Sequence, residues 1–160
     1  MMLCVFVMTV GVITARAQEL GSSYKTALGV KIWGDGGGIT LKHFVASNHA
    51  LEGIGYFWSG GTRITGLYEF YFDIVGAPGL KWYVGPGAHV GFYNSHYYDN
   101  NPNNGQTYGS YIGIDGVLGL DYKFNGAPIN LSLDWQPSFE FGINRGFVGS
   151  WGGLGIRYTF

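Results

Sequence analysis

Polar and apolar residues alternate along this chain over unusually long stretches. Residues 80–92 place apolar side chains at nearly all even positions, while the odd positions hold Lys81, His89 and several glycines. Residues 112–124 repeat this two-residue period, with Asp115, Asp121 and Lys123 on the polar side. A period of two predicts β-strands with one apolar and one polar face. Because the polar faces carry ionisable groups and glycines, the pattern predicts a barrel with an apolar outside and a polar inside.

Turn signals rich in Gly, Asn and Pro separate eight such segments. Their approximate bounds are 26–33, 39–45, 51–58, 63–72, 80–92, 112–124, 129–140 and 151–160. An open sheet in hydrocarbon would leave unpaired backbone groups at its edges, so spanning strands must close into a barrel. We therefore predict an all-β fold, an eight-stranded antiparallel transmembrane up-and-down β-barrel. An even strand number places both termini on one side of the membrane.

The alternation also predicts which side chains meet lipid and where the regular pairing is interrupted. In the third segment we expect Ile54, Tyr56 and Trp58 outside and Glu52 inside. Pro86 and Pro137 lack a backbone donor, which predicts a bulge or local break at each. Two aromatic belts are expected at the rims. One belt holds Phe70, Phe72, Trp82, Tyr122, Phe124, Tyr158 and Phe160, and the other holds Trp58, Phe92 and Phe139.

The first seventeen residues have the features of a signal peptide. Residues 2–14 are apolar but too short to span a bilayer, and Ala15-Arg16-Ala17 matches the small-x-small cleavage pattern. Because no Lys or Arg precedes Arg16, we expect the true start codon a few positions upstream. Residues 1–17 are thus predicted to be a signal peptide and residues 18–160 an outer-membrane barrel. Cleavage removes Cys4, the one cysteine, which fits an exported chain.

Composition narrows the class further. Aromatic residues make up 18% of the chain and charged residues 12%, and Gly occurs 29 times. Lipid-facing strands joined by tight turns account for this combination. A net charge of -1 and the lack of a basic patch argue against nucleic acid as a partner. A soluble barrel of the lipocalin kind is excluded because it would bury the charges and expose the apolar face to water.

The end of the chain and several segments carry a resemblance to a known class. Leu154, Ile156, Tyr158 and Phe160 alternate up to a terminal aromatic residue, and the segments include LEGIGYFW, GLKWYVGPGAHVGFY and IGIDGVLGLDYKF. The chain resembles small outer-membrane β-barrels of the OmpA/OmpX-type superfamily and is similar to porin-like barrels of Bacteroidetes. This implies a monomer in the bacterial outer membrane, in contact with its lipid and lipopolysaccharide. It also implies that Tyr158 and Phe160 signal to the barrel-assembly machinery.

The polar face supplies the candidate functional residues. Six basic and six acidic side chains face inward, and His89 lies near them in the pattern. They are Lys31, Lys42, Glu52, Arg63, Glu69, Lys81, Asp115, Asp121, Lys123, Asp134, Glu140 and Arg157. Eight strands enclose a lumen that side chains fill, so these charges are expected to pair and plug it. The predicted function is non-enzymatic, in envelope structure or surface interaction. The alternative is a narrow ion or small-solute channel, in which rearranged pairs open a gap.

Other chemistry has weaker support in the sequence. A lipid-modifying outer-membrane enzyme would need a His with a Ser, for which His43 with Ser47 and His89 with Ser132 or Ser138 are the candidates. His96 and Asp99 are too few to predict a metal site, and we expect no cofactor. Residues 94–110 form the longest connection, and Tyr97, Tyr98 and Tyr108 stand there among asparagines. Such a loop predicts a surface for an extracellular protein or glycan.

Overall fold

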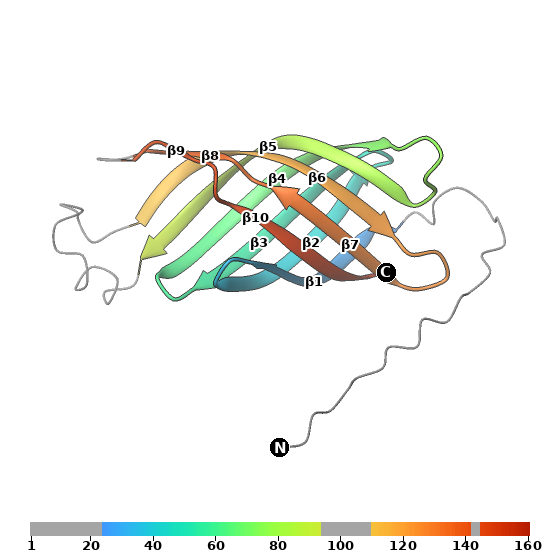
Figure 1. Ribbon diagram of the computed structural model, residues 1–160, viewed down its shortest axis with the longest axis horizontal. Helices are drawn as coiled ribbons and strands as arrows, with labels where there is room; N and C mark the ends of the chain where they lie inside the picture. The colour runs from blue at the N-terminus through green and yellow to red at the C-terminus, as the bar shows by residue number, and fades with distance from the viewer. Residues whose placement is uncertain (1–23, 94–109, 142–144) are drawn as a thin grey trace, which may run out of the picture.

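The chain folds into strands that wrap around a common axis, as the computed structural model shows (Figure 1). The structure describes residues 24–93, 110–141 and 145–160. The signal-peptide prediction and the loop tyrosines Tyr97, Tyr98 and Tyr108 lie outside these residues. The strands are β1 (Thr26–Trp33), β2 (Gly36–Ala46), β3 (His49–Trp58), β4 (Gly61–Asp73), β5 (Leu80–Tyr93), β6 (Ser110–Lys123), β7 (Ile129–Trp135), β8 (Ser138–Phe141), β9 (Phe147–Val148) and β10 (Gly152–Thr159).

The strands close into a barrel of eight antiparallel walls. Neighbours in sequence pair from β1 to β7, and β10 pairs with both β7 and β1, which completes the ring. β7 and β8 form one wall, because both pair with β6 in the same register: Leu118 is opposite Trp135 and Ile114 is opposite Phe139. β9 pairs with β8 and leads into β10. The all-β, eight-stranded, up-and-down fold is therefore confirmed, with strand bounds close to those predicted.

The two ends of the barrel differ in their connections. The turn end holds residues 47–48, 74–79 and 124–128 together with Tyr24 and Phe160. The loop end holds residues 34–35 and 59–60, together with the end of β5 at Tyr93 and the start of β6 at Ser110. Some turns are shorter than predicted, because Gly36, Gly37 and Gly38 pair with β1 and belong to β2. Gly34, with φ of 56°, takes the left-handed conformation that this tight turn needs.

The two prolines interrupt pairing without shifting it. β5 runs through Pro86, but its ladder with β4 lacks partners between Gly87 and Val84 and then resumes in register. At Pro137 the wall divides into β7 and β8, again without an extra residue. The predicted break is confirmed at Pro137, whereas Pro86 leaves its own strand continuous. Gly116 lies opposite Pro86 and donates its backbone N–H to the Pro137 carbonyl at 2.8 Å.

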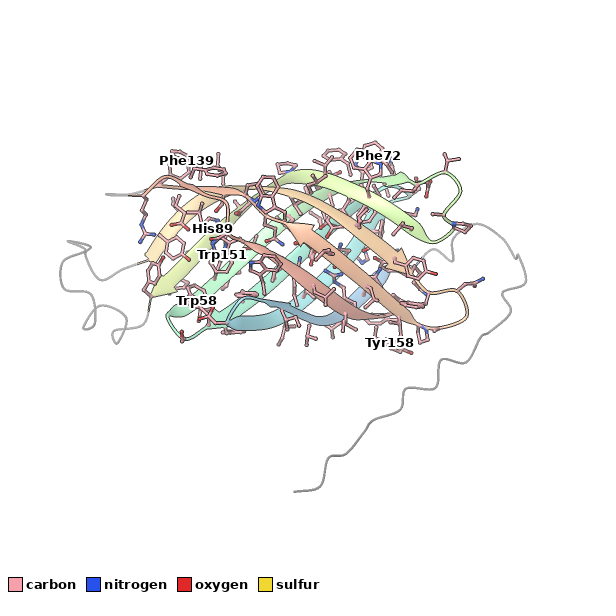
Figure 2. The ribbon with its side chains drawn as sticks, in the orientation of Figure 1. Trp58, Phe72, His89, Phe139, Trp151 and Tyr158 are labelled. Carbon is pink, nitrogen blue, oxygen red and sulfur yellow. The ribbon has the colours of Figure 1, made fainter. Side chains whose placement is uncertain are left out.

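The outer wall is apolar along its whole length. Exposed side chains such as Leu28, Ile39, Ile114 and Leu133 alternate with buried polar ones. Among the described strand residues, no Asp, Glu, Lys or Arg occupies an outward position. Figure 2 shows Phe72, Phe139 and Tyr158 pointing away from the barrel near its ends. The described residues contain no helix long and apolar enough to cross a membrane.

The third wall corrects the prediction for three apolar residues. Ile54 and Tyr56 are buried inside, 4% and 5% exposed, and Trp58 points inward at the loop end (Figure 2). All three stand at even positions, as Glu52 does, and every second side chain of a β-strand points to the same face. They must therefore lie inside the barrel with Glu52. Trp58 accordingly leaves the outer belt, where Phe57 takes its place with 53% exposure. Hydrophobicity alone misplaced these residues because a narrow lumen is filled partly by apolar side chains.

Candidate functional site

The middle of the lumen holds seven charged side chains, which we call the central cluster. One comes from each of β1, β2, β3, β4, β6, β7 and β10. They are Lys31, Lys42, Glu52, Glu69, Asp121, Asp134 and Arg157, and each is at most 4% exposed. The remaining wall, β5, contributes Tyr83, whose hydroxyl donates to Asp134 at 2.6 Å. All eight walls of the barrel therefore contribute a side chain at this level of the lumen.

Ion pairs connect the central cluster across the lumen. Glu52 pairs with Arg157 and lies 3.4 Å from the Nζ of Lys31 and 3.2 Å from that of Lys42. Lys31 also pairs with Asp134 at 2.6 Å, and Lys42 with Glu69 at 2.9 Å. Buried charges are tolerated when paired and hydrogen-bonded in this way. Glu52 is thus the hub that joins three cations from three walls.

Neutral polar groups complete these contacts. The Arg157 guanidinium donates to Ser132 at 2.7 Å, and to Thr40 and Asn130 at 3.2 Å each. Asn130 in turn donates to Asp121 at 2.6 Å. The Lys42 ammonium lies 4.4 Å from the centre of the Tyr83 ring, within the range of a cation–π contact. The sequence analysis did not predict Thr40, Asn130 or Tyr83 as partners and considered Ser132 only beside His89, although the inward positions of all four could be read from the alternation.

Nearer the loop end lies a second group of charges, the outer cluster: Arg63, His89, Asp115, Glu140 and Arg145. Asp115 accepts from Arg63 and lies 2.9 Å from the Nδ1 of His89. The His89 Nε2 is 3.9 Å from Glu140, which pairs with Arg145 at 2.9 Å. The histidine fits because Gly113 faces it, where a Cβ atom would be 2.4 Å from the ring. The sequence analysis missed Arg145, which lies outside the strands.

Aromatic rings surround the charged groups of the outer cluster. The Arg63 guanidinium lies 4.4 Å from the centre of the Trp151 ring, and Arg145 lies 4.4 Å from that of Tyr111. Trp151 also meets Trp58 and Tyr56 edge-on, at 5.3 and 5.4 Å between centroids. Figure 2 shows Trp58, Trp151 and His89 within the barrel. Charge at this level is thus confined to one side of the lumen.

Polar atoms without a hydrogen-bond partner concentrate in this outer half. Six buried side-chain atoms lack one among the described residues, and four of them are Arg63 Nη1, His89 Nε2, Tyr111 OH and Ser138 Oγ. The other two belong to Glu52 and Glu69, and the Glu52 oxygen is still within 3.2 Å of an ammonium. Buried unpaired groups are costly, so the outer half is less completely satisfied than the central cluster.

Two predicted interior lysines lie at the turn end instead of in a cluster. Lys81 has a side chain that is 33% exposed and pairs with Asp73 at 3.1 Å. Lys123 donates to the carbonyls of Phe124 and Ala127, at 2.8 and 2.6 Å, and so holds the turn that follows β6. Both have inward parity, but they lie near strand ends, where the lumen opens. The remaining eleven predicted interior residues belong to the two clusters.

The turn end of the lumen contains a cavity of about 380 Å³. Its lining includes Tyr24, Phe44, Lys81 and Lys123, with Asp121 beneath them. Tyr24 packs edge-on against Phe44 at 5.1 Å between centroids, and its hydroxyl lies 3.5 Å from Asp121. Burial, and then the nearby Asp121 carboxylate, raise the pKa of the Tyr24 phenol, which keeps it a neutral donor.

The histidines considered for catalysis are placed as follows. His43 Nδ1 lies 2.8 Å from the Thr26 hydroxyl, and no contact between His43 and Ser47 is found. His89 engages Asp115, but its Nε2 forms no hydrogen bond with Ser132 or Ser138. His96 and Asp99 lie outside the described residues. Among the described residues, no group of three or more His, Cys, Asp or Glu is arranged to hold a metal ion.

Tyr158 and Phe160, the predicted assembly signal, point outward at the turn end with 59% and 65% exposure. Their rings lie 6.2 Å apart between centroids. Comparison with known proteins adds no relative: no protein-family model, no curated protein and no solved structure matches the chain. The class that fold and interior define is therefore a closed eight-stranded β-barrel with a charged lumen.

Proposed function

We propose that this protein is an outer-membrane β-barrel with a plugged lumen, which serves envelope structure or surface interaction and not catalysis. The observation that carries the proposal is the central cluster, in which charged side chains from seven walls meet on the barrel axis inside an apolar shell. A soluble protein would need the reverse arrangement, with apolar residues inside and charge outside.

The outer face supports the membrane part of the proposal. Exposed aliphatic residues such as Val30, Leu118 and Leu133 cover the walls between their two ends. Trp33, Phe57 and Phe139 mark the loop end, and Phe72, Trp82 and Tyr158 mark the turn end. An apolar band between two aromatic girdles is the surface of a transmembrane β-barrel. In water the same face would expose far more contiguous apolar surface than soluble monomers tolerate.

Side-chain packing supports the plugged lumen. Lys31, Lys42 and Arg157 are each at most 1% exposed, so the middle of the lumen leaves no room for a hydrated ion beside them. Opening a path would separate Glu52 from Arg157 and leave buried charges unpaired. The alternative of a narrow ion or small-solute channel requires that rearrangement. Partners at the loop end, such as an extracellular protein or glycan, stay a prediction.

Quenching of tryptophan fluorescence by brominated lipids tests the membrane part. Variants that keep one tryptophan are refolded into bilayers whose lipids carry bromine near the headgroup or near the chain end. Trp82 and Trp135, exposed by 37% and 47% on the outer face, should both be quenched by lipid bromine, and Trp82, at the turn end, most strongly by the shallow label. Trp58 and Trp151 lie inside the barrel and serve as matched controls that lipid bromine should not reach.

Fractionation of cells that express the full chain completes this test. The protein should sediment with outer-membrane markers and resist extraction by salt. Equal quenching of all the tryptophans, or recovery of the folded chain as a soluble protein, would contradict the proposal.

A further inference from the structure

The cavity at the turn end is a second feature of the lumen, separate from the central cluster. It occupies about 380 Å³ and is reached from the end where both described chain termini lie. Phe44, Lys81 and Lys123 line it from inward strand positions, so it opens to the aqueous side of the rim and not to the lipid-facing wall. Its size lies within the range of small-molecule sites.

Charge around the cavity is predominantly positive. Lys25, Lys81 and Lys123 line it, against a single carboxylate, Asp121. That carboxylate is already engaged, by Asn130 at 2.6 Å and by Lys42 at 3.7 Å. Two of the lysines are less committed: Lys25 is exposed, and the partner of Lys81, Asp73, has a side chain 80% exposed. Lys123 donates to the carbonyls of Phe124 and Ala127, which leaves one ammonium hydrogen for a ligand. An exposed ion pair of this kind exchanges readily for another anion.

The cavity also has an apolar wall. Phe44, Val45 and Ala46 follow one another along β2, where a bulge disturbs pairing with β3 between Phe44 and Ala46. Phe44 is held between the rings of Tyr24 and Tyr71, at 5.1 and 4.8 Å between centroids. A rigid aromatic surface next to flexible cations matches a ligand with an apolar body and one acidic group.

We propose that this cavity binds a small soluble organic anion, whose acidic group contacts Lys25, Lys81 and Lys123 and whose apolar body packs on Phe44 and Val45. Charge complementarity fixes the sign of the ligand, and the inward lining fixes its source as the aqueous compartment instead of the bilayer. The proposal does not depend on the plugged lumen, because the cavity lies beyond the central cluster.

Titration with phenyl phosphate tests the site. The full barrel is reconstituted in nanodiscs of zwitterionic lipid, and the backbone amide signals of Phe44, Lys81 and Lys123 are followed by NMR. Phenyl phosphate should shift these signals in a saturable manner. Benzyl alcohol, which lacks the charge, and inorganic phosphate, which lacks the ring, should each bind more weakly. Shifts confined to other residues would overturn the proposal.

Two substitutions of opposite effect sharpen the test. Lys81→Gln should weaken binding of phenyl phosphate about fivefold, while Asp73→Asn, which frees Lys81, should strengthen it by a similar factor. Asp35→Asn changes the net charge equally at the loop end and should leave affinity unchanged. If Lys81→Gln and Asp73→Asn bind alike, or if Asp35→Asn matches Asp73→Asn, the lysines do not form the site.

A change of lipid composition distinguishes a soluble ligand from one that the bilayer supplies. Nanodiscs that contain anionic phospholipid should leave the amide signals of Phe44, Lys81 and Lys123 unchanged before the probe is added. Displacement of these signals by the lipid alone would contradict a soluble ligand. Failure of the tryptophan quenching experiment would concern the membrane proposal and not this cavity, so the two outcomes are distinguishable.

Discussion

The inner half of the lumen, with the central cluster, and the outer half, with the outer cluster, hold similar charged residues but differ in how completely their buried polar groups are paired. In the central cluster, Arg157 contacts Glu52, Thr40, Asn130 and Ser132, and every wall takes part. In the outer half, four buried polar atoms have no partner, against two in the central cluster, and the charges of the outer cluster come from one side. The proposed plug therefore rests on the middle of the barrel, where charged side chains from seven walls meet.

Loss of the central arginine should have the largest effect. Arg157→Met leaves Glu52 short of its main partner in a dry lumen, so the free energy of unfolding should fall by about 3 to 5 kcal/mol. Urea unfolding of the barrel in lipid vesicles, followed by tryptophan fluorescence, measures it. Arg145→Met removes one charged partner of Glu140 in the outer cluster and should cost less, about 1.5 to 3 kcal/mol. Equal losses would erase the distinction between the clusters.

The comparison presumes a lipid-facing wall around both clusters. Leu133→Arg places a charge on the outward face near mid-wall and should cost about 2 to 4 kcal/mol, whereas Ile129→Arg on the same strand lies near the turn end and should cost at most about 1 kcal/mol. Both side chains are exposed in the isolated barrel, by 52% and 42%, so burial in protein does not separate them. The same unfolding assay applies. Equal costs would argue against a bilayer.

The same substitution at two serines, one beside the central cluster and one in the outer half, compares the two regions directly. Ser132 accepts from Arg157 at 2.7 Å, whereas the Ser138 hydroxyl is buried without a partner. Ser132→Ala should therefore destabilise by about 1.5 to 3 kcal/mol, while Ser138→Ala should be neutral or slightly stabilising. The urea concentrations at the unfolding midpoints measure this difference in stability, provided that the free energy of unfolding depends on urea with the same slope in both variants. A larger loss for Ser138→Ala would show that the outer hydroxyl has a partner in the bilayer-bound protein.

The smallest expected effect concerns the backbone beside β9. The indole of Trp135 donates to the Gly149 carbonyl at 2.8 Å, and that of Trp33 donates to the Ser150 carbonyl at 2.6 Å, between β9 and β10. Trp135→Phe removes one such bond and should cost about 1 kcal/mol, with faster amide exchange in residues 147–151. Trp82→Phe preserves the stacking with Phe72 and serves as control. Unchanged amide exchange in residues 147–151 would show that the Trp135 indole does not hold this backbone in place.

The sequence predicted the barrel well because alternation records, at each strand position, which side is apolar. The eight segments and the inward parity of Lys31, Glu69 and Arg157 followed from that rule. It failed for Ile54, Tyr56 and Trp58, where apolar character was given more weight than parity. It also gave no partners, because which inward groups meet depends on strand register and tilt. Arg145 could not be assigned inside because its segment has no alternation.

Conductance of the refolded protein in a planar bilayer tests the central claim most directly. Quenching of Trp82 and Trp135 by lipid bromine first establishes that the protein has inserted. The absence of current then cannot result from a bilayer that contains no protein. Because the central cluster joins seven walls through buried ion pairs and the eighth through the Tyr83 hydrogen bond, the account predicts no steady single-channel current from the wild-type barrel. Steady openings of uniform size from the wild type would contradict the plugged lumen and favour the channel.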